Sequence, residues 1–322
     1  MICFYFASLK LSLIDSLRIN HLKYPLGIDI TDNNFSFKTN EEGPFKARIL
    51  LGTTVIEEKE IKLENSHSFA FNTTLEYNKT YKYVVEGSTS KEELEFETSI
   101  KLYNRFIKPK YKDIFSPIFF KEFNLIKTSK IKKARLYITG LGLYRAFINN
   151  ERVGNSYLSP GYNDYSYYLR YQTYDITHLL KESNLIEVHM GDGWYKGRFG
   201  LSSKGEIFGN EYKLNAHILI EFEDGEVQEI STDETWKVKH SQEISNGIYD
   251  GEEIDFTYEN KTIEEVILSE ENYNLVPDFS SPIIEKEILT PELYISPKGE
   301  KILDFKQNMV GFIRYKGHLN NN

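Results

Sequence analysis

The chain has 322 residues, a formal net charge of -9 and 14% aromatic residues. This length is enough for two or three domains, each with a hydrophobic core. The negative charge and the lack of long basic runs exclude nucleic acid as an expected partner, and a single cysteine, Cys3, excludes an internal disulfide framework and a cysteine-ligated zinc site.

The beginning of the chain bears on localisation. Residues 1–9 are apolar, but they lack the basic region, the long apolar region and the small-residue cleavage site of a signal peptide. No later run approaches the roughly 20 apolar residues that cross a bilayer. We therefore expect no membrane association and favour a cytoplasmic location.

The N-terminal part of the chain predicts a β-sandwich. Short runs rich in β-branched and aromatic residues recur there with turn residues between them, at a spacing typical of sandwiches. The runs are 17–20, 35–38, 47–51, 55–61, 68–71, 81–85 and 94–98. We assign 1–99 to a fibronectin-III-like or immunoglobulin-like sandwich without catalytic chemistry.

A domain boundary is expected after this sandwich. Residues 100–116 have no clean periodicity and contain Pro109, which removes a backbone donor, so we predict a linker there. The next domain, 117–282, contains alternating apolar positions such as Ala134, Leu136 and Ile138. This alternation indicates strands with one buried face.

Local signals place further elements. Asp175 is a candidate N-cap for a short helix over 176–181. The strongest turn signal, Asp224-Gly225, predicts a hairpin between 217–222 and 227–230. Residues 283–322 are expected to open a third, incomplete β-domain, with a turn at 297–299 before a strand at 301–305. The fold class is therefore all-β.

A series of ordered motifs fills the stretch 134–200. The motifs are 140–142, 149–154, 158–165, 171–177 and 191–198, with further matches at 26–29, 96–98, 246–252 and 302–311. In this order they resemble the N-terminal β-domains of bacterial α-L-rhamnosidases. Glycine is usual in that family where this chain has Asn150 and Lys306, and asparagine keeps the first turn accessible because it tolerates positive φ.

The resemblance implies a fold and an activity. The second domain is expected to be a galactose-binding-like jelly roll with sugar-binding character. Members of the family are inverting glycoside hydrolases that cut their substrate in an (α/α) barrel after the β-domains. The sequence contains no such barrel, so we expect a truncated part of the enzyme that is inactive alone. The barrel, from the same polypeptide or operon, and a rhamnose-containing oligosaccharide are the expected partners.

Two loops concentrate side chains that suit a sugar ring. Such a ring needs polar partners for its hydroxyls and a flat apolar surface for its C–H face. The candidate carbohydrate-binding residues are Tyr162, Asn163, Asp164, Tyr165, Asp192, Trp194, Tyr195 and Arg198. A nucleotide site at 191–197 is rejected because the third glycine comes one residue late and 199–203 cannot open a helix. Instead, these glycines predict a tight loop that presents Trp194.

Several of these residues have a structural alternative. Trp194 could pack in a core or between domains, and Asp192 is expected to pair with Arg198 and stiffen the loop. In some relatives the acidic position that matches Asp164 helps to bind a terminal rhamnose through calcium, so the resemblance makes Asp164 a candidate calcium ligand. Tyr165 replaces the second oxygen ligand, and the alternative is that Asp164 caps its turn. No other cofactor is expected.

No catalytic residues are nominated. Glycoside hydrolysis needs two carboxyl groups at a defined separation, and the 48 acidic residues offer many pairs without selecting one. The sequence has no metalloprotease, serine-hydrolase or Walker motif. We predict a non-catalytic β-module that recognises rhamnose-containing glycans or supports the barrel. The alternatives are a purely structural module and a stand-alone sugar-binding protein.

Overall fold

The computed structural model describes residues 14–62, 68–111, 115–126, 130–200, 204–259, 262–314 and 316–317. Cys3 and the apolar stretch 1–9, on which the signal-peptide prediction rests, lie outside these ranges. The chain splits into two compact units, 1–283 and 284–322. Within the described ranges no helix is long and apolar enough to cross a membrane.

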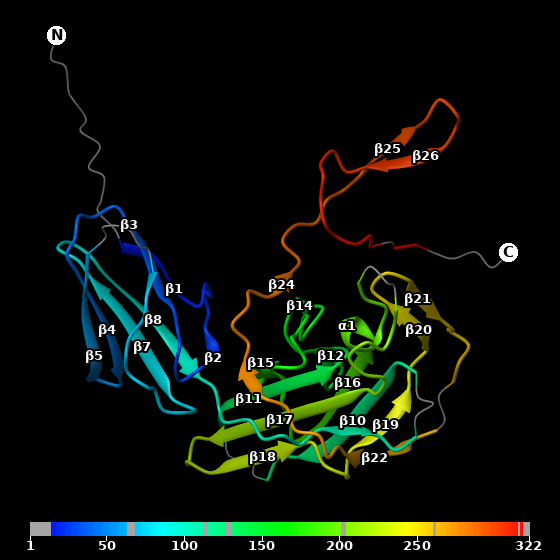
Figure 1. The fold of residues 1–322 in the computed structure, drawn as a ribbon, viewed down its shortest axis with the longest axis horizontal. Coiled ribbons are helices and arrows are strands. Elements are labelled where there is room, and N and C mark those ends of the chain that lie inside the picture. Colours follow the sequence, from blue (N-terminus) through cyan, green and yellow to red (C-terminus); the bar gives the residue numbers. More distant parts are fainter. Residues whose placement is uncertain are drawn as a thin grey trace. The chain divides into compact units, whose positions relative to one another are not determined.

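Two sheets form the N-terminal sandwich (Figure 1). One sheet has the strand order β1-β3-β6 and the other has the order β2-β8-β7-β4-β5. The strands are β1 (Ile14–Ile19), β2 (Leu26–Ile28), β3 (Phe35–Thr39), β4 (Phe45–Leu51), β5 (Thr54–Ile61), β6 (Ser68–Phe69), β7 (Thr80–Glu86) and β8 (Lys91–Thr98). All seven predicted runs overlap strands, and the additional β2 pairs in parallel with β8.

The core of this sandwich follows from the alternation of its strands. Phe45, Ala47 and Ile49 on β4 are buried, as expected when every second side chain points to the same face. Phe35 from the opposite sheet contacts Tyr83 with the ring centroids 5.1 Å apart. Aromatic packing between two sheets confirms the predicted sandwich class.

The second domain is one sheet folded into two layers. One layer has the order β13-β12-β16-β10-β19 and the other the order β9-β17-β11-β15-β23, while β22 pairs with both β19 and β9. The strands are β9 (Ile107–Pro109), β10 (Pro117–Asn124), β11 (Ile131–Leu141), β12 (Leu143–Ile148), β13 (Glu151–Arg152), β15 (Leu169–Asp175), β16 (Ser183–Gly191), β17 (Lys213–Phe222), β18 (Val227–Ser231), β19 (Lys237–His240), β22 (Glu264–Leu268) and β23 (Leu275–Pro277). Shorter elements at its rim are β14 (Ser156–Tyr157), η1 (Thr177–Leu179), α1 (Gly193–Lys196), β20 (Glu243–Gly247) and β21 (Gly251–Ile254).

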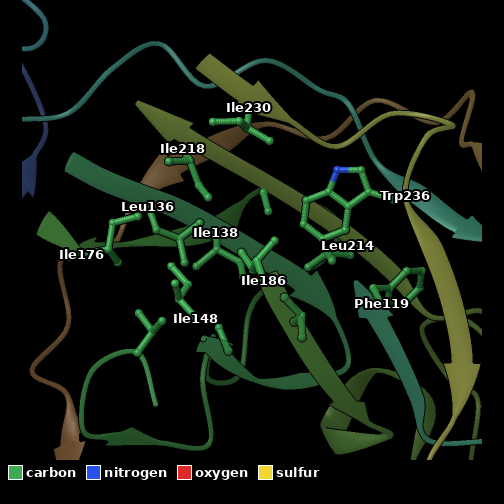
Figure 2. Packing of buried hydrophobic residues seen from close by; sticks show 14 of the residues in the cluster. Phe119, Leu136, Ile138, Ile148, Ile176, Ile186, Leu214, Ile218, Ile230 and Trp236 are labelled. Atoms are coloured by element: carbon green, nitrogen blue, oxygen red, sulfur yellow. The ribbon is translucent and has the colours of Figure 1, made fainter. Parts of the chain in front are cut away.

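A single apolar core fills the space between these layers. Figure 2 shows side chains from both layers in this core, among them Phe119 and Ile186 from one layer and Leu136 and Ile218 from the other, and Trp236 belongs to the same core. Trp236 is 1% exposed, and its indole N–H donates to a backbone carbonyl at 2.9 Å. The buried ring therefore keeps its polar atom satisfied.

Local predictions have mixed outcomes. β17 and β18 pair as the predicted hairpin. Asn149 and Asn150 have φ values of 53° and 68°, so the predicted turn is confirmed. The helix predicted over 176–181 is wrong, because only the 3₁₀ turn η1 forms before the chain becomes extended at Leu180. Asp175 instead accepts hydrogen bonds from the backbone N–H and the hydroxyl of Thr177.

The segment before the second domain also contributes to its sheet. Ile107 is fully buried, and β9 pairs with β17 and β22, ending at Pro109. Leu102 and Phe106 are buried as well. The position of a linker at 100–116 stays a prediction.

The second unit contains one hairpin. β25 (Glu292–Ile295) pairs with β26 (Lys301–Asp304), which agrees with the predicted turn at 297–299, and β24 (Ile283–Ile284) lies at the boundary between the units. Lys306, where the resembled family has glycine, has a φ of 62°. The backbone therefore keeps the left-handed conformation without glycine.

Candidate functional site

Two loops meet at one edge of the second domain. The loop 158–168 leads into β15 and the loop 192–212 leads into β17. Both strands pair antiparallel with β11, so both begin near the end of β11. The sheet topology therefore brings together the two loops that carry the predicted site residues.

Six aromatic side chains from these loops form what we call the aromatic cluster. Its members are Tyr162, Tyr165, Trp194, Tyr195, Phe199 and Phe208. Tyr162 stacks on Phe199 with the ring centroids 5.4 Å apart, and its ring meets Trp194 edge-on at 6.4 Å. Tyr162 is 45% exposed, so the cluster reaches the surface.

Glycines shape the loop that presents Trp194. Gly193 has a φ of +57°, and a Cβ on Gly197 would lie 2.4 Å from the carbonyl oxygen of Gly193. Only glycine permits this close approach of two backbone segments. The predicted tight loop is therefore present, with Trp194 and Tyr195 on the short helix α1 inside it.

Two predicted residues hold the site rather than line its surface. Asn163 is 1% exposed, and its side-chain oxygen accepts from the backbone N–H of Arg170 at 3.0 Å and from the Arg170 guanidinium at 3.1 Å. Tyr195 is 5% exposed and packs with Phe106, Leu141 and Leu169. Both residues fix the loops to the domain.

The predicted pair between Asp192 and Arg198 is wrong. Asp192 accepts from Lys196 at 3.1 Å and from the hydroxyl of Tyr212. Arg198 forms a two-pronged ion pair with Asp250, at 2.7 and 3.2 Å. The reason is that Asp192 directly follows β16 at the start of α1, where its carboxylate lies beside Lys196 and Tyr212. Arg198 follows α1 and reaches Asp250 in the turn between β20 and β21.

Asp164 is exposed at the tip of its loop. Its carboxylate accepts from the backbone N–H of Ser166 at 3.4 Å, and its carbonyl oxygen accepts from Tyr167 and Tyr168. In the described part of the chain no group of three or more His, Cys, Asp or Glu is placed to hold a metal. Calcium takes six to eight oxygen ligands, and a calcium site at Asp164 stays a prediction.

The buried phenols of Tyr165 and Tyr195 stay neutral at physiological pH. Burial raises the pKa of Tyr165, and the neighbouring Tyr162 and Tyr195 add to the effect. Burial also raises the pKa of Tyr195. Neutral phenols can both donate and accept hydrogen bonds, which suits uncharged hydroxyl groups.

Phe199 and Phe208 were not predicted as site residues. Phe199 directly follows Arg198, and Phe208 lies in the same loop, where no sequence period marks either residue. Phe208 meets Tyr165 at 4.9 Å and Phe199 at 5.9 Å. The sequence signal that could have indicated these two residues is the high aromatic content of 192–212.

Known proteins of one family match this chain. The family model of the alpha-L-rhamnosidase N-terminal domain matches residues 129–294. An α-L-rhamnosidase of Streptomyces avermitilis is 29% identical over 201 residues, which are 58% of this chain and 19% of that protein. One from Formosa agariphila is 29% identical over 200 residues, which are 57% of this chain and 21% of that protein. The chain thus spans about a fifth of the length of these relatives.

Solved structures agree on the fold. The native α-L-rhamnosidase from Aspergillus terreus has a TM-score of 0.76 and 25% identity, with 92% of this chain and 39% of that chain covered. The Streptomyces avermitilis α-L-rhamnosidase complexed with L-rhamnose has a TM-score of 0.76 and 15% identity, with 92% of this chain and 49% of that chain covered. Because the family model matches more than half of the sequence, the chain belongs to the α-L-rhamnosidase family through its N-terminal domain.

Proposed function

We propose that this chain is a non-catalytic part of an α-L-rhamnosidase and that the aromatic cluster contacts a rhamnose-containing glycan. The observation that carries the proposal is the convergence of two separate loops on one partly exposed aromatic surface. The sugar in the complex of the Streptomyces avermitilis relative supports rhamnose as the ligand class.

The surface offers both kinds of contact that a pyranose needs. The rings of Tyr162 and Trp194 supply an apolar face for C–H groups. The exposed carboxylate of Asp164 supplies acceptors for sugar hydroxyls from the same loop as Tyr162. The proposal needs no calcium, and addition of EDTA to the titration described next tests that point.

Titration calorimetry with L-rhamnose tests the proposal. We expect a dissociation constant on the order of 0.1 to 1 mM, because few atoms would be buried. Trp194→Ala and Asp164→Ala should each weaken binding by roughly 1 to 3 kcal/mol. Tyr24→Ala is the matched control, because Tyr24 is 80% exposed and lies in the other sandwich.

Two results would contradict the proposal. Rhamnose binding that survives both Trp194→Ala and Asp164→Ala would place the sugar elsewhere. If rhamnose does not bind, and a helical barrel supplied as a separate chain docks onto the aromatic cluster, the cluster is an interdomain surface and the structural alternative holds.

A further inference from the structure

A cavity of about 190 Å³ lies outside the aromatic cluster. One wall comes from the segment between β2 and β3, with Asp29, Thr31 and Asp32. The other wall comes from Val276 on β23, the residues that follow it, and Tyr168 at the end of the loop 158–168. The N-terminal sandwich and the second domain therefore line this cavity together.

The second wall is aromatic and firmly held. The rings of Tyr168 and Phe279 lie 6.1 Å apart at an angle of 59°. The guanidinium of Arg170 lies 5.6 Å from the centre of the Phe279 ring. Asp278, the residue before Phe279, accepts hydrogen bonds from the Gln172 amide at 2.9 Å and the Ser280 backbone at 2.9 Å. These contacts fix the backbone that carries Phe279.

The opposite wall is rich in hydrogen-bond acceptors. Asp29 accepts from the backbone N–H of Thr31 at 3.0 Å. The hydroxyl of Thr31 lies within hydrogen-bond distance of Asp29, at 3.2 Å, and of Asp32, at 3.4 Å. One hydroxyl thus lies between two carboxylates, which have further acceptor sites of their own because each carboxylate offers about four lone-pair positions.

We propose that this cavity is a second carbohydrate site that takes one neutral sugar residue. The C–H face of the ring would lie against Tyr168 and Phe279, and its hydroxyls would donate to Asp29 and Asp32. An apolar ligand would desolvate both carboxylates and leave their remaining acceptor sites unpaired, and an anionic ligand would be repelled by them. The site is separate from the aromatic cluster, so it does not depend on the function proposed above.

Methyl NMR of the full chain tests this assignment, because Val276 lines the cavity. The Val276 methyl signals are identified by their loss in Val276→Ala. We then titrate L-rhamnose, D-glucose and D-glucuronate into the Trp194→Ala variant, which removes an aromatic face of the cluster. At least one neutral sugar should shift the Val276 signals, with a dissociation constant on the order of 1 mM, and glucuronate should not.

Substitutions in the two walls sharpen the test. Phe279→Ala should raise the dissociation constant of the neutral sugar about tenfold. Phe256→Ala is the control, because its ring is 76% exposed, and it should leave this constant unchanged. Asp32→Asn removes a charge that repels glucuronate. The dissociation constants of glucose and glucuronate should therefore become more similar.

Other outcomes overturn the proposal. If no neutral sugar shifts the Val276 signals while the unsubstituted chain still binds L-rhamnose, the cavity is not a sugar site and the aromatic cluster stands alone. If tetramethylammonium shifts the signals and the sugars do not, the cavity takes organic cations instead.

Discussion

Glu97 on β8 and Arg135 on β11 form a two-pronged ion pair between the two sandwiches. The distances are 3.1 Å from Nε to Oε1 and 3.1 Å from Nη2 to Oε2. The side chains are only 7% and 12% exposed. Lys133 lies 3.5 Å from the same carboxylate, so one buried acid faces two cations. This cluster couples the first sandwich to the sheet that carries the candidate site.

Removal of the Glu97 charge should destabilise the protein. Glu97→Gln removes the buried carboxylate that Arg135 and Lys133 share. Arg135 keeps Asp175 at 3.0 Å and Lys133 keeps Glu221 at 3.2 Å, so we expect a loss of about 2 kcal/mol in the free energy of unfolding, less than for a fully unpaired buried charge. Urea denaturation measures this loss. Glu93→Gln is the control, because Glu93 pairs with Lys82 on the surface, where a pair is worth at most about 1 kcal/mol. Equal effects of the two substitutions would contradict the coupling.

Gly142 should tolerate no side chain. It joins β11 to β12 with a φ of +114°, and a Cβ there would lie 2.5 Å from the carbonyl oxygen of Gly191. Gly142→Ala should therefore lower the free energy of unfolding by about 3 kcal/mol or more, because backbone strain and a clash combine.

Gly52 is the matched control for this substitution. It has a φ of +60°, and nothing lies within 4 Å of a Cβ placed there. Gly52→Ala should lower the free energy of unfolding by only about 1 to 2 kcal/mol, because alanine is strained in the left-handed conformation but meets no clash there. Thermal unfolding of the two variants separates the clash from the strain, and equal melting temperatures would show that no clash exists.

His189 should make stability depend on pH. Burial lowers the pKa of His189 to about 4, and its ring packs 5.1 Å from Phe147. In the unfolded chain a histidine has a pKa of about 6.5, so between these values the unfolded state binds a proton that the folded state does not. Stability should therefore fall as the pH drops from about 6.5 to about 4, by up to roughly 3 kcal/mol.

Denaturation at pH 7 and at about pH 4.5 measures this contribution. His189→Gln should lose less stability on acidification than the unsubstituted chain. His21→Gln serves as the control, because His21 is exposed and water reaches it in both states. An unchanged acid dependence in His189→Gln would refute the assignment.

The chain by itself should not hydrolyse an aryl α-L-rhamnoside. The part of the chain that the structure describes is nearly all β, and an apolar core fills the space between the two layers of the second domain. We expect rates equal to those of buffer alone. Turnover that disappears with a single Asp or Glu substitution in this chain would overturn the non-catalytic assignment.

The sequence by itself determined the class of the fold and much of its local structure. Alternation such as that of Ala134, Leu136 and Ile138 reports which face of a strand is buried, and Asp224-Gly225 reports a turn, because both signals are local. The loops 158–168 and 192–212 could be nominated as a site for the same reason, since their composition is readable residue by residue.

Only the tertiary structure decided the partners within that site. Arg198 pairs with Asp250 rather than with Asp192, and Phe199 and Phe208 complete the aromatic cluster. The cavity next to Asp32 joins residues from two different sandwiches. Such contacts depend on how strands far apart in the chain are ordered within the sheets, and no local period or turn signal encodes that order.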